Sequence, residues 1–120
     1  MFEYATAAVE SALAAGASYA DARVVSTKTE AIEVLNQQLQ SVDRGETIGV
    51  GVRALIGSSW GFYATPELTD AASRDAGARA AAVAKASALV SGPPLDLADI
   101  PVNEAFWETP HTEHWADVSL

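Results

Sequence analysis

The chain has 120 residues, enough for one domain with a buried core but few for an enzyme that encloses its own site. Hydrophobic residues make up 49% and charged residues 19%, as in an ordinary folded protein, and no apolar run approaches the ~20 residues of a membrane-spanning helix. The net charge of −9 disfavours nucleic acid, and the absence of cysteine excludes disulfides and thiolate metal sites. We therefore expect a soluble domain that binds neither nucleic acid nor membrane.

The N-terminal segment predicts a helix that stops at Gly16. Its apolar side chains recur at helical spacing: Phe2, Ala5, Val9, Ala12 and Leu13. The same segment, MFEYATAAVE, lacks the basic start and long apolar core of a secretion signal. We therefore expect a cytoplasmic protein.

The next segment, residues 21–46, predicts short antiparallel strands. β-Branched residues alternate there with polar ones, and the strand candidates are ARVVST, AIEVL and LQSVD. Lys28-Thr29 and Asn36-Gln37 are the expected reversal points. With the hairpin that follows, this predicts a meander of about five strands.

The stretch IGVGVRALIGSSWGFYATP, residues 48–66, predicts a single hairpin. Its first half alternates with a period of two, so one strand face is expected to be buried, and Gly57-Ser58 fits a type II′ turn. Counting from that turn places Arg53 opposite Phe62 and Leu55 opposite Trp60. The other face is then expected to collect glycines, an arginine and aromatic rings: Gly49, Gly51, Arg53, Trp60 and Phe62.

These five residues are our candidates for contact with a partner or a peptide. The glycines favour close approach of a neighbouring chain over a phosphate loop, because no third glycine follows and no helix begins there. The role of Arg53 has two possible interpretations. It forms a cation–π pair with Phe62, or it meets a partner carboxylate or peptide beside Trp60, since arginine and tryptophan are enriched at binding hot spots.

A second helix follows the hairpin, with Thr65 as its N-terminal cap and Pro66 as its first residue. Its expected apolar stripe runs through an alanine-rich segment: Leu68, Ala72, Ala76, Val83 and Val90. The chain thus predicts an α+β domain over residues 1–92, with two helices packed on one face of the sheet. Residues 93–120 form a proline-rich tail that we expect to lead toward a C-terminal catalytic domain.

The histidines of the tail invite a zinc interpretation, which their spacing disfavours. His111 and His114 lie three apart in a proline-broken segment, whereas the helical HExxH motif places its histidines four apart. We interpret them as surface residues. The carboxylates lie on separate strand candidates, and no serine stands in a GxSxG motif. The sequence therefore predicts no catalytic residue and no metal ligand in this chain.

Several segments resemble the N-terminal domain of the TldD/PmbA family. They are GASYADARV, DRGETIGVGVRALIGSSWGFYATPELT and the alanine-rich helix that ends in AKAS. In the tail, FWETP and the closing DVSL are similar to the TldD side of the family. The resemblance covers nearly the whole chain, and the hairpin with the helix after it is the most specific part.

The resemblance implies a zinc-dependent cytosolic peptidase of paired TldD-like and PmbA-like subunits that acts on small or unfolded peptides. Members have also been labelled modulators of DNA gyrase, although a charge of −9 gives no support to direct DNA contact. The family's metal is held through an HExxxH motif in a second domain, and this sequence contains no such motif. We therefore expect a non-catalytic domain without a cofactor of its own.

Its expected role is substrate access and subunit pairing. The expected partners are its own C-terminal catalytic domain, a PmbA-like paralogue or a second copy, and the peptide substrate, which an unpaired sheet edge can receive by strand addition. The alternative is a free-standing peptide- or protein-binding module without catalytic activity.

Overall fold

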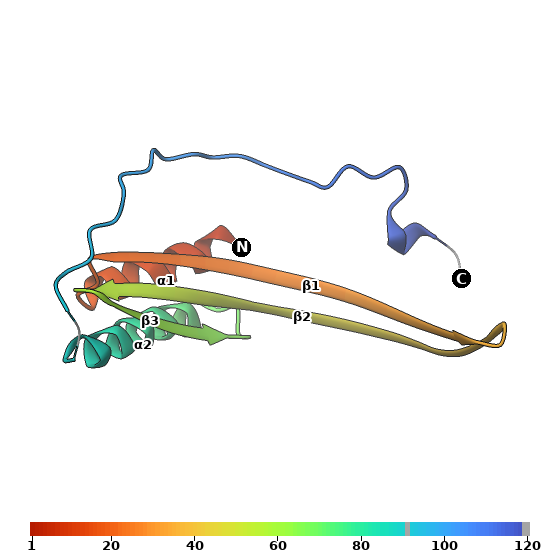
Figure 1. Cartoon of the computed structure of the whole chain (residues 1–120), viewed down its shortest axis with the longest axis horizontal. Helices are drawn as coiled ribbons and strands as arrows, with labels where there is room; N and C mark the ends of the chain where they lie inside the picture. Colours follow the sequence, from red (N-terminus) through yellow and green to blue (C-terminus); the bar gives the residue numbers. More distant parts are fainter. Residues whose placement is uncertain (91, 119–120) are drawn as a thin grey trace.

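The computed structural model describes residues 1–90 and 92–118. Its main elements in chain order are α1 (Phe2–Ala14), β1 (Tyr19–Leu35), β2 (Gln38–Ile56), β3 (Ser59–Thr65) and α2 (Asp70–Ala88). The strands form one antiparallel sheet in the order β1-β2-β3, and the two helices pack against each other and on the sheet (Figure 1). The predicted α+β class with two helices is confirmed.

The five-strand meander is wrong, because long strands replace the short ones. ARVVST and AIEVL both lie within β1, and LQSVD continues into the hairpin strand as β2. The reversal at Asn36-Gln37 is confirmed, and both residues have positive φ, 50° and 63°. Lys28-Thr29 is no turn, because Thr29 stays extended opposite Gly45 and its hydroxyl donates to the carbonyl oxygen of Gly45 at 3.4 Å.

The β1–β2 hairpin extends well beyond β3. Pairing between β2 and β3 ends where Val50 meets Thr65, whereas β1 and β2 stay paired as far as Leu35 and Gln38. We call this two-stranded extension, residues 26–49, the ribbon. It makes the molecule elongated, with extents of 60 × 29 × 29 Å (Figure 1).

The short hairpin between β2 and β3 has the predicted register. Arg53 pairs with Phe62, Leu55 with Trp60 and Gly51 with Ala64. Gly57 has a φ of +62° while Ser58 keeps a negative φ, as a type II′ turn requires. The turn glycine therefore sets which side chains share each face of the sheet.

Small residues bring the helices close to the sheet and to each other. A Cβ atom built on Gly61 would lie 2.0 Å from the carbonyl oxygen of Ala80, and one on Gly77 would lie 2.1 Å from that of Ala8. The buried apolar residues are mostly alanine and valine from both layers: Ala8, Ala12, Ala17, Val50, Val52, Ala54, Ala76, Ala80 and Ala81. The backbones thus approach at distances that larger side chains would prevent.

The predicted apolar stripes of both helices are wrong at their large residues, because Phe2, Leu13, Val83 and Val90 are exposed and alanines make the close contacts instead. Helix α1 buries Ala7, Ala8 and Ala12, while Phe2 is 90% exposed. Helix α2 buries Ala76 from the predicted stripe, but Val90 beyond its end is 92% exposed.

The start of α2 also differs from the prediction. The helix begins at Asp70, and the hydroxyl of Thr69 accepts from the backbone N–H of Ala72 at 3.1 Å. Thr65 ends β3 instead, and its hydroxyl accepts from the N–H of Glu67 at 3.2 Å.

The tail leaves the helical end of the molecule and runs beside the ribbon to a 3-10 helix, η1 (Trp115–Asp117) (Figure 1). It is tied at its start, where the N–H of Leu95 donates to the carbonyl oxygen of Gly57 at 3.0 Å. The expected approach to a helix at DVSL falls partly on Ser119 and Leu120, which lie outside the described residues. Neither α1 nor α2 has the length and apolar content needed to cross a bilayer.

Candidate partner-contact face

The sheet face away from the helices carries all five candidate residues. Strand alternation puts Gly49, Gly51 and Arg53 of β2 on this face, opposite the buried Val50 and Val52. The register puts Phe62 and Trp60 of β3 there as well. We call this surface the open face. The structure therefore brings the predicted candidates together.

Strand β1 completes the open face with residues that the sequence did not single out. Asp21 pairs with Arg53, Arg23 with Gly51 and Val25 with Gly49. They were missed because the expected turn at Lys28-Thr29 broke β1, so its register against β2 was unknown. Counting back from Asn36-Gln37 along a continuous strand would have placed Asp21 opposite Val52, because the register shifts by one residue between Glu33 and Val34.

Arg53 is held between an acid and an aromatic ring. Its guanidinium donates to both carboxylate oxygens of Asp21, with the closest contact between Nη2 and Oδ2 at 2.6 Å. Its Cζ lies 5.0 Å from the ring centre of Trp60, so the expected cation–π pair forms with Trp60 and not with Phe62. The hydrogen bonds that Arg53 donates to Asp21 raise the pKa of Arg53 above its ordinary value, which keeps the cation charged.

Trp60 is fixed from its other side by Tyr19. The two rings meet edge to face with centres 5.8 Å apart. Tyr19 and Trp60 remain 39% and 38% exposed, so the cluster is ordered yet reachable from solvent. An oriented, half-exposed arginine and tryptophan require little further ordering when a partner binds.

The glycines of the open face serve contacts within the domain. A Cβ atom on Gly51 would lie 3.2 Å from the ring of Phe62, so the phenyl group lies across this glycine. A Cβ atom on Gly49 would lie 2.9 Å from the carbonyl oxygen of Thr65. The space that we expected a neighbouring chain to fill is thus partly filled by β3 itself.

Two shallow hollows flank Phe62, which is 61% exposed. One, of about 240 Å³, is lined by the Asp21–Arg53 pair together with Arg23, Val25, Gly51 and Phe62. The other, of about 400 Å³, has a mainly apolar lining: Val25, Ile48, Gly49, Val50, Gly51, Phe62, Ala64 and Pro66, with Thr47 and Thr65. Together they offer an apolar surface with a charged pair at one end, which suits an extended segment bearing apolar and polar side chains.

The tail histidines lie apart from this face. Nδ1 of His111 is 2.9 Å from the carbonyl oxygen of Thr109, and Nδ1 of His114 accepts from the N–H of Ala116 at 3.2 Å. Within residues 1–90 and 92–118, no three side chains of the metal-binding types come together. The described residues therefore do not fit the zinc that the resemblance implies for the complete protein.

The fold and the open face define a small α+β domain with one covered and one uncovered sheet face. The family model described as PmbA/TldA metallopeptidase domain 1 matches residues 20–88, from β1 to the end of α2. The chain therefore belongs to the PmbA/TldD metallopeptidase family, as its first, N-terminal domain. A search of curated proteins found no match to the chain.

Proposed function

We propose that this domain is a non-catalytic part of a zinc-dependent peptidase, in which it contributes to substrate access and subunit pairing. The zinc would be held in a further domain of the complete protein and would activate water for peptide hydrolysis. The open face would meet the catalytic domain, a paralogous subunit or the peptide.

The observation that carries the proposal is the ordered cluster of Arg53, Trp60 and Asp21 beside an exposed apolar surface. Arginine and tryptophan contribute strongly to protein interfaces when they are fixed before binding. Membership in a metallopeptidase family is the reason to propose peptide hydrolysis as the reaction of the complete protein. The missing metal ligands in the described residues are the reason to place the chemistry elsewhere.

The test is the double variant Arg53→Ala/Trp60→Ala in the complete protein. Loss of two hot-spot residues is expected to lower peptide turnover or subunit association about tenfold or more. Turnover of a fluorogenic peptide and sedimentation of the assembled subunits measure the two effects.

The matched control is Lys85→Ala/Trp107→Ala, which removes a cation and an indole from exposed positions outside the open face. This control should retain both activities. Normal turnover and normal association in the Arg53/Trp60 variant would show that the open face has neither role. Sequencing the gene past the codon for Leu120 separates this proposal from a free-standing binding module, which would end without a metal-binding continuation.

A further inference from the structure

Two glycines of β2 leave a trough on the open face. Gly51 and Gly49 form its floor, because they carry no side chain and lie on the same face of the strand. Arg23 and Val25 of β1 stand along one side of the floor, and Phe62 of β3 stands along the other. The hollows of about 240 Å³ and about 400 Å³ are parts of this surface, which we call the trough.

Arg23, at the smaller hollow, is a cation without an acid. The chain has seven lysines and arginines, and five of them form ion pairs: Lys28, Arg44, Arg53, Arg74 and Arg79. Among the residues that the structure describes, no acid pairs with the other two, Arg23 and Lys85. The carboxylate nearest to Arg23 along the strand, Asp21, already accepts from Arg53.

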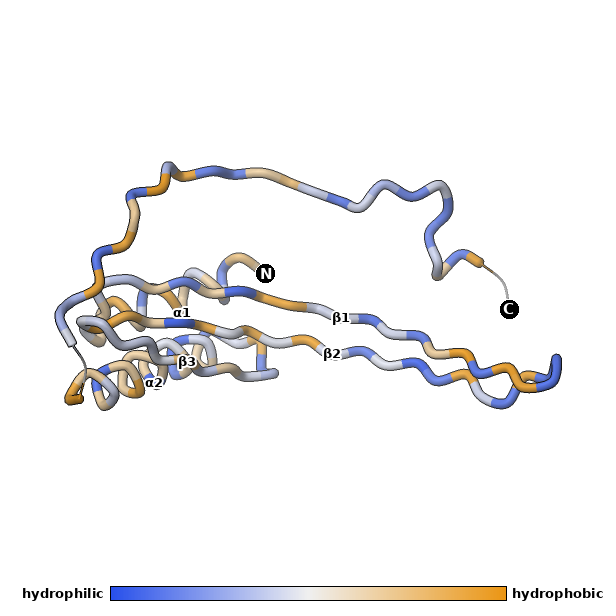
Figure 2. Tube along the Cα trace, viewed as in Figure 1, coloured by the Kyte–Doolittle hydropathy of each residue, from blue (hydrophilic) through white to orange (hydrophobic). Residues whose placement is uncertain are grey.

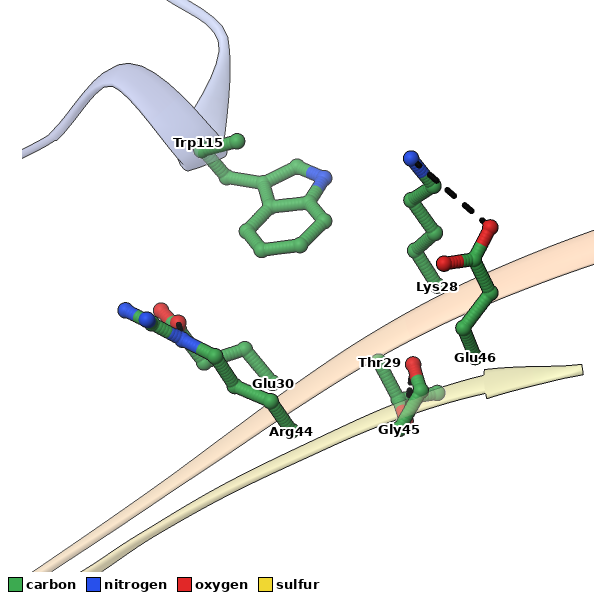
Figure 3. A pocket seen from close by; sticks show the side chains of 8 residues that line it. Lys28, Thr29, Glu30, Arg44, Gly45, Glu46 and Trp115 are labelled. Carbon is green, nitrogen blue, oxygen red and sulfur yellow. Dashed lines mark hydrogen bonds and ion pairs between the residues drawn. The ribbon is translucent and has the colours of Figure 1, made fainter.

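The cations on the helix side of the ribbon are satisfied within the chain. Lys28 lies beside Glu46, with Nζ and Oε1 3.8 Å apart, and Arg44 donates to the carboxylate of Glu30. Trp115 of the tail lies over this set across a hollow of about 430 Å³ (Figure 3). The described tail residues line neither hollow of the trough, so the trough stays open to solvent.

We propose that the trough binds an extended peptide that carries a carboxylate side chain and a large apolar side chain two residues apart. The carboxylate lies in the smaller hollow, at Gly51, and accepts hydrogen bonds from Arg23. The apolar side chain lies in the larger hollow, which extends over Gly49 and has a mainly apolar lining. Side chains two residues apart in an extended peptide share one face and are about 6.5–7 Å apart, the same spacing as the two glycines in β2.

The local charge favours an acid, although the net charge of the chain is −9. Arg23, Arg53 and Asp21 line the smaller hollow and leave one positive charge in excess. Charges farther away than about 8 Å are largely screened at physiological ionic strength. In Figure 2 the hydrophilic positions in this half of β1 and β2 alternate with apolar ones, whereas the ribbon is hydrophilic over longer stretches. An acid bound at Arg23 therefore lies beside apolar surface, where water screens it less.

This inference rests on the proposed function, because it names the class of peptide that the open face admits. The larger hollow falls within the range of about 300–1,000 Å³ that is typical of sites for small ligands. A docked subunit instead covers about 800 Å² on each partner. The trough therefore fits a peptide substrate better than a subunit.

The experiment is a titration of the full chain with labelled peptides, followed by fluorescence anisotropy. Short serine–glycine peptides carry glutamate and leucine two positions apart, in either order, and matched peptides carry lysine in place of glutamate. We expect the unchanged chain to bind a glutamate peptide about fivefold or more tighter than its lysine counterpart. In Arg23→Glu the preference should reverse, with the lysine peptide bound about threefold or more tighter.

Lys85→Glu is the matched control, because it makes the same change of net charge at the other cation without an acid, on α2. It should keep the preference for glutamate. A reversed preference requires a folded trough, so it cannot result from misfolding of Arg23→Glu. A chain that binds neither glutamate peptide would overturn the inference, as would an Arg23→Glu variant that still prefers glutamate.

A second arm uses the complete protein to separate a peptide from a subunit. Arg23→Glu should leave the sedimentation of the assembled subunits unchanged. Weakened association without a change in peptide preference would make the trough a subunit interface and overturn the inference. The proposed function fails by a different result, namely normal turnover and association in Arg53→Ala/Trp60→Ala, so the two failures are distinguishable.

Discussion

Gly61 determines how closely β3 can approach α2. A Cβ atom there would lie 2.0 Å from the carbonyl oxygen of Ala80 and 2.4 Å from the backbone nitrogen of Ala84. Both are helix backbone atoms, which cannot turn away as a flexible side chain can. The sheet and the helix must therefore separate if any side chain is added at this position.

We expect Gly61→Ala to lower the free energy of unfolding by about 1–3 kcal/mol, the usual cost of overpacking a close-packed core. Chemical denaturation monitored by circular dichroism measures the loss. Gly92→Ala is the control, because a Cβ atom at Gly92 meets nothing within 4 Å. Equal stability of the two variants would mean that β3 and α2 are not in close contact.

The pairing partners of single residues were predictable where a nearby turn residue fixed the register of the two strands. Gly57 allowed the facing pairs of β2 and β3 to be counted correctly, and with them the sheet face that the five candidate residues share. The partner of Arg53 was not predictable from that hairpin. Asp21 comes from a strand that is 32 residues earlier in sequence, and only a continuous β1 brings the two together.

Strand lengths were the least predictable feature at the level of elements. Lys28 and Thr29 are polar, and between two β-branched runs they were read as a turn. In the structure Lys28 pairs with Glu46, so cross-strand pairing holds the polar residues in extended backbone. The alternation of apolar and polar residues predicts a strand but does not show where it ends.

The Asn36-Gln37 turn permits a test of the ribbon as an element. Gln37 has a φ of 63°, a conformation that costs a residue with a side chain about 1 kcal/mol and that glycine adopts freely. We expect Gln37→Gly to slow amide hydrogen exchange in the ribbon severalfold. Gln38→Gly, at the first position of β2, should speed exchange because glycine loses more backbone entropy than glutamine when it is held extended in the closing pair with Leu35. Equal effects of both variants would contradict a positive-φ turn at this place.

On the scale of the whole molecule, the core occupies one end of the long axis and the ribbon the other, while the open face lies across the sheet from the core. The core residues of the helices and strands, among them Ala8, Val52 and Ala81, lie at the end where the helices cover the sheet. The ribbon projects from this end without a helix layer, and the tail follows it with few ties to the body (Figure 1). The open face and the ribbon are therefore available for contact without disturbing the core.

This division predicts that most of the tail can be removed without loss of stability. The last backbone hydrogen bond given between the described tail and the body joins Leu95 to Gly57, so a chain ending at Asp96 keeps it. Its free energy of unfolding should stay within about 0.5 kcal/mol of the full chain, as for changes away from packed groups. A chain ending at Gly92 loses that bond and should be less stable by about 1 kcal/mol. If the chain ending at Asp96 is already as unstable as the chain ending at Gly92, the contact of Trp115 with the ribbon contributes to folding, and the tail is part of the domain.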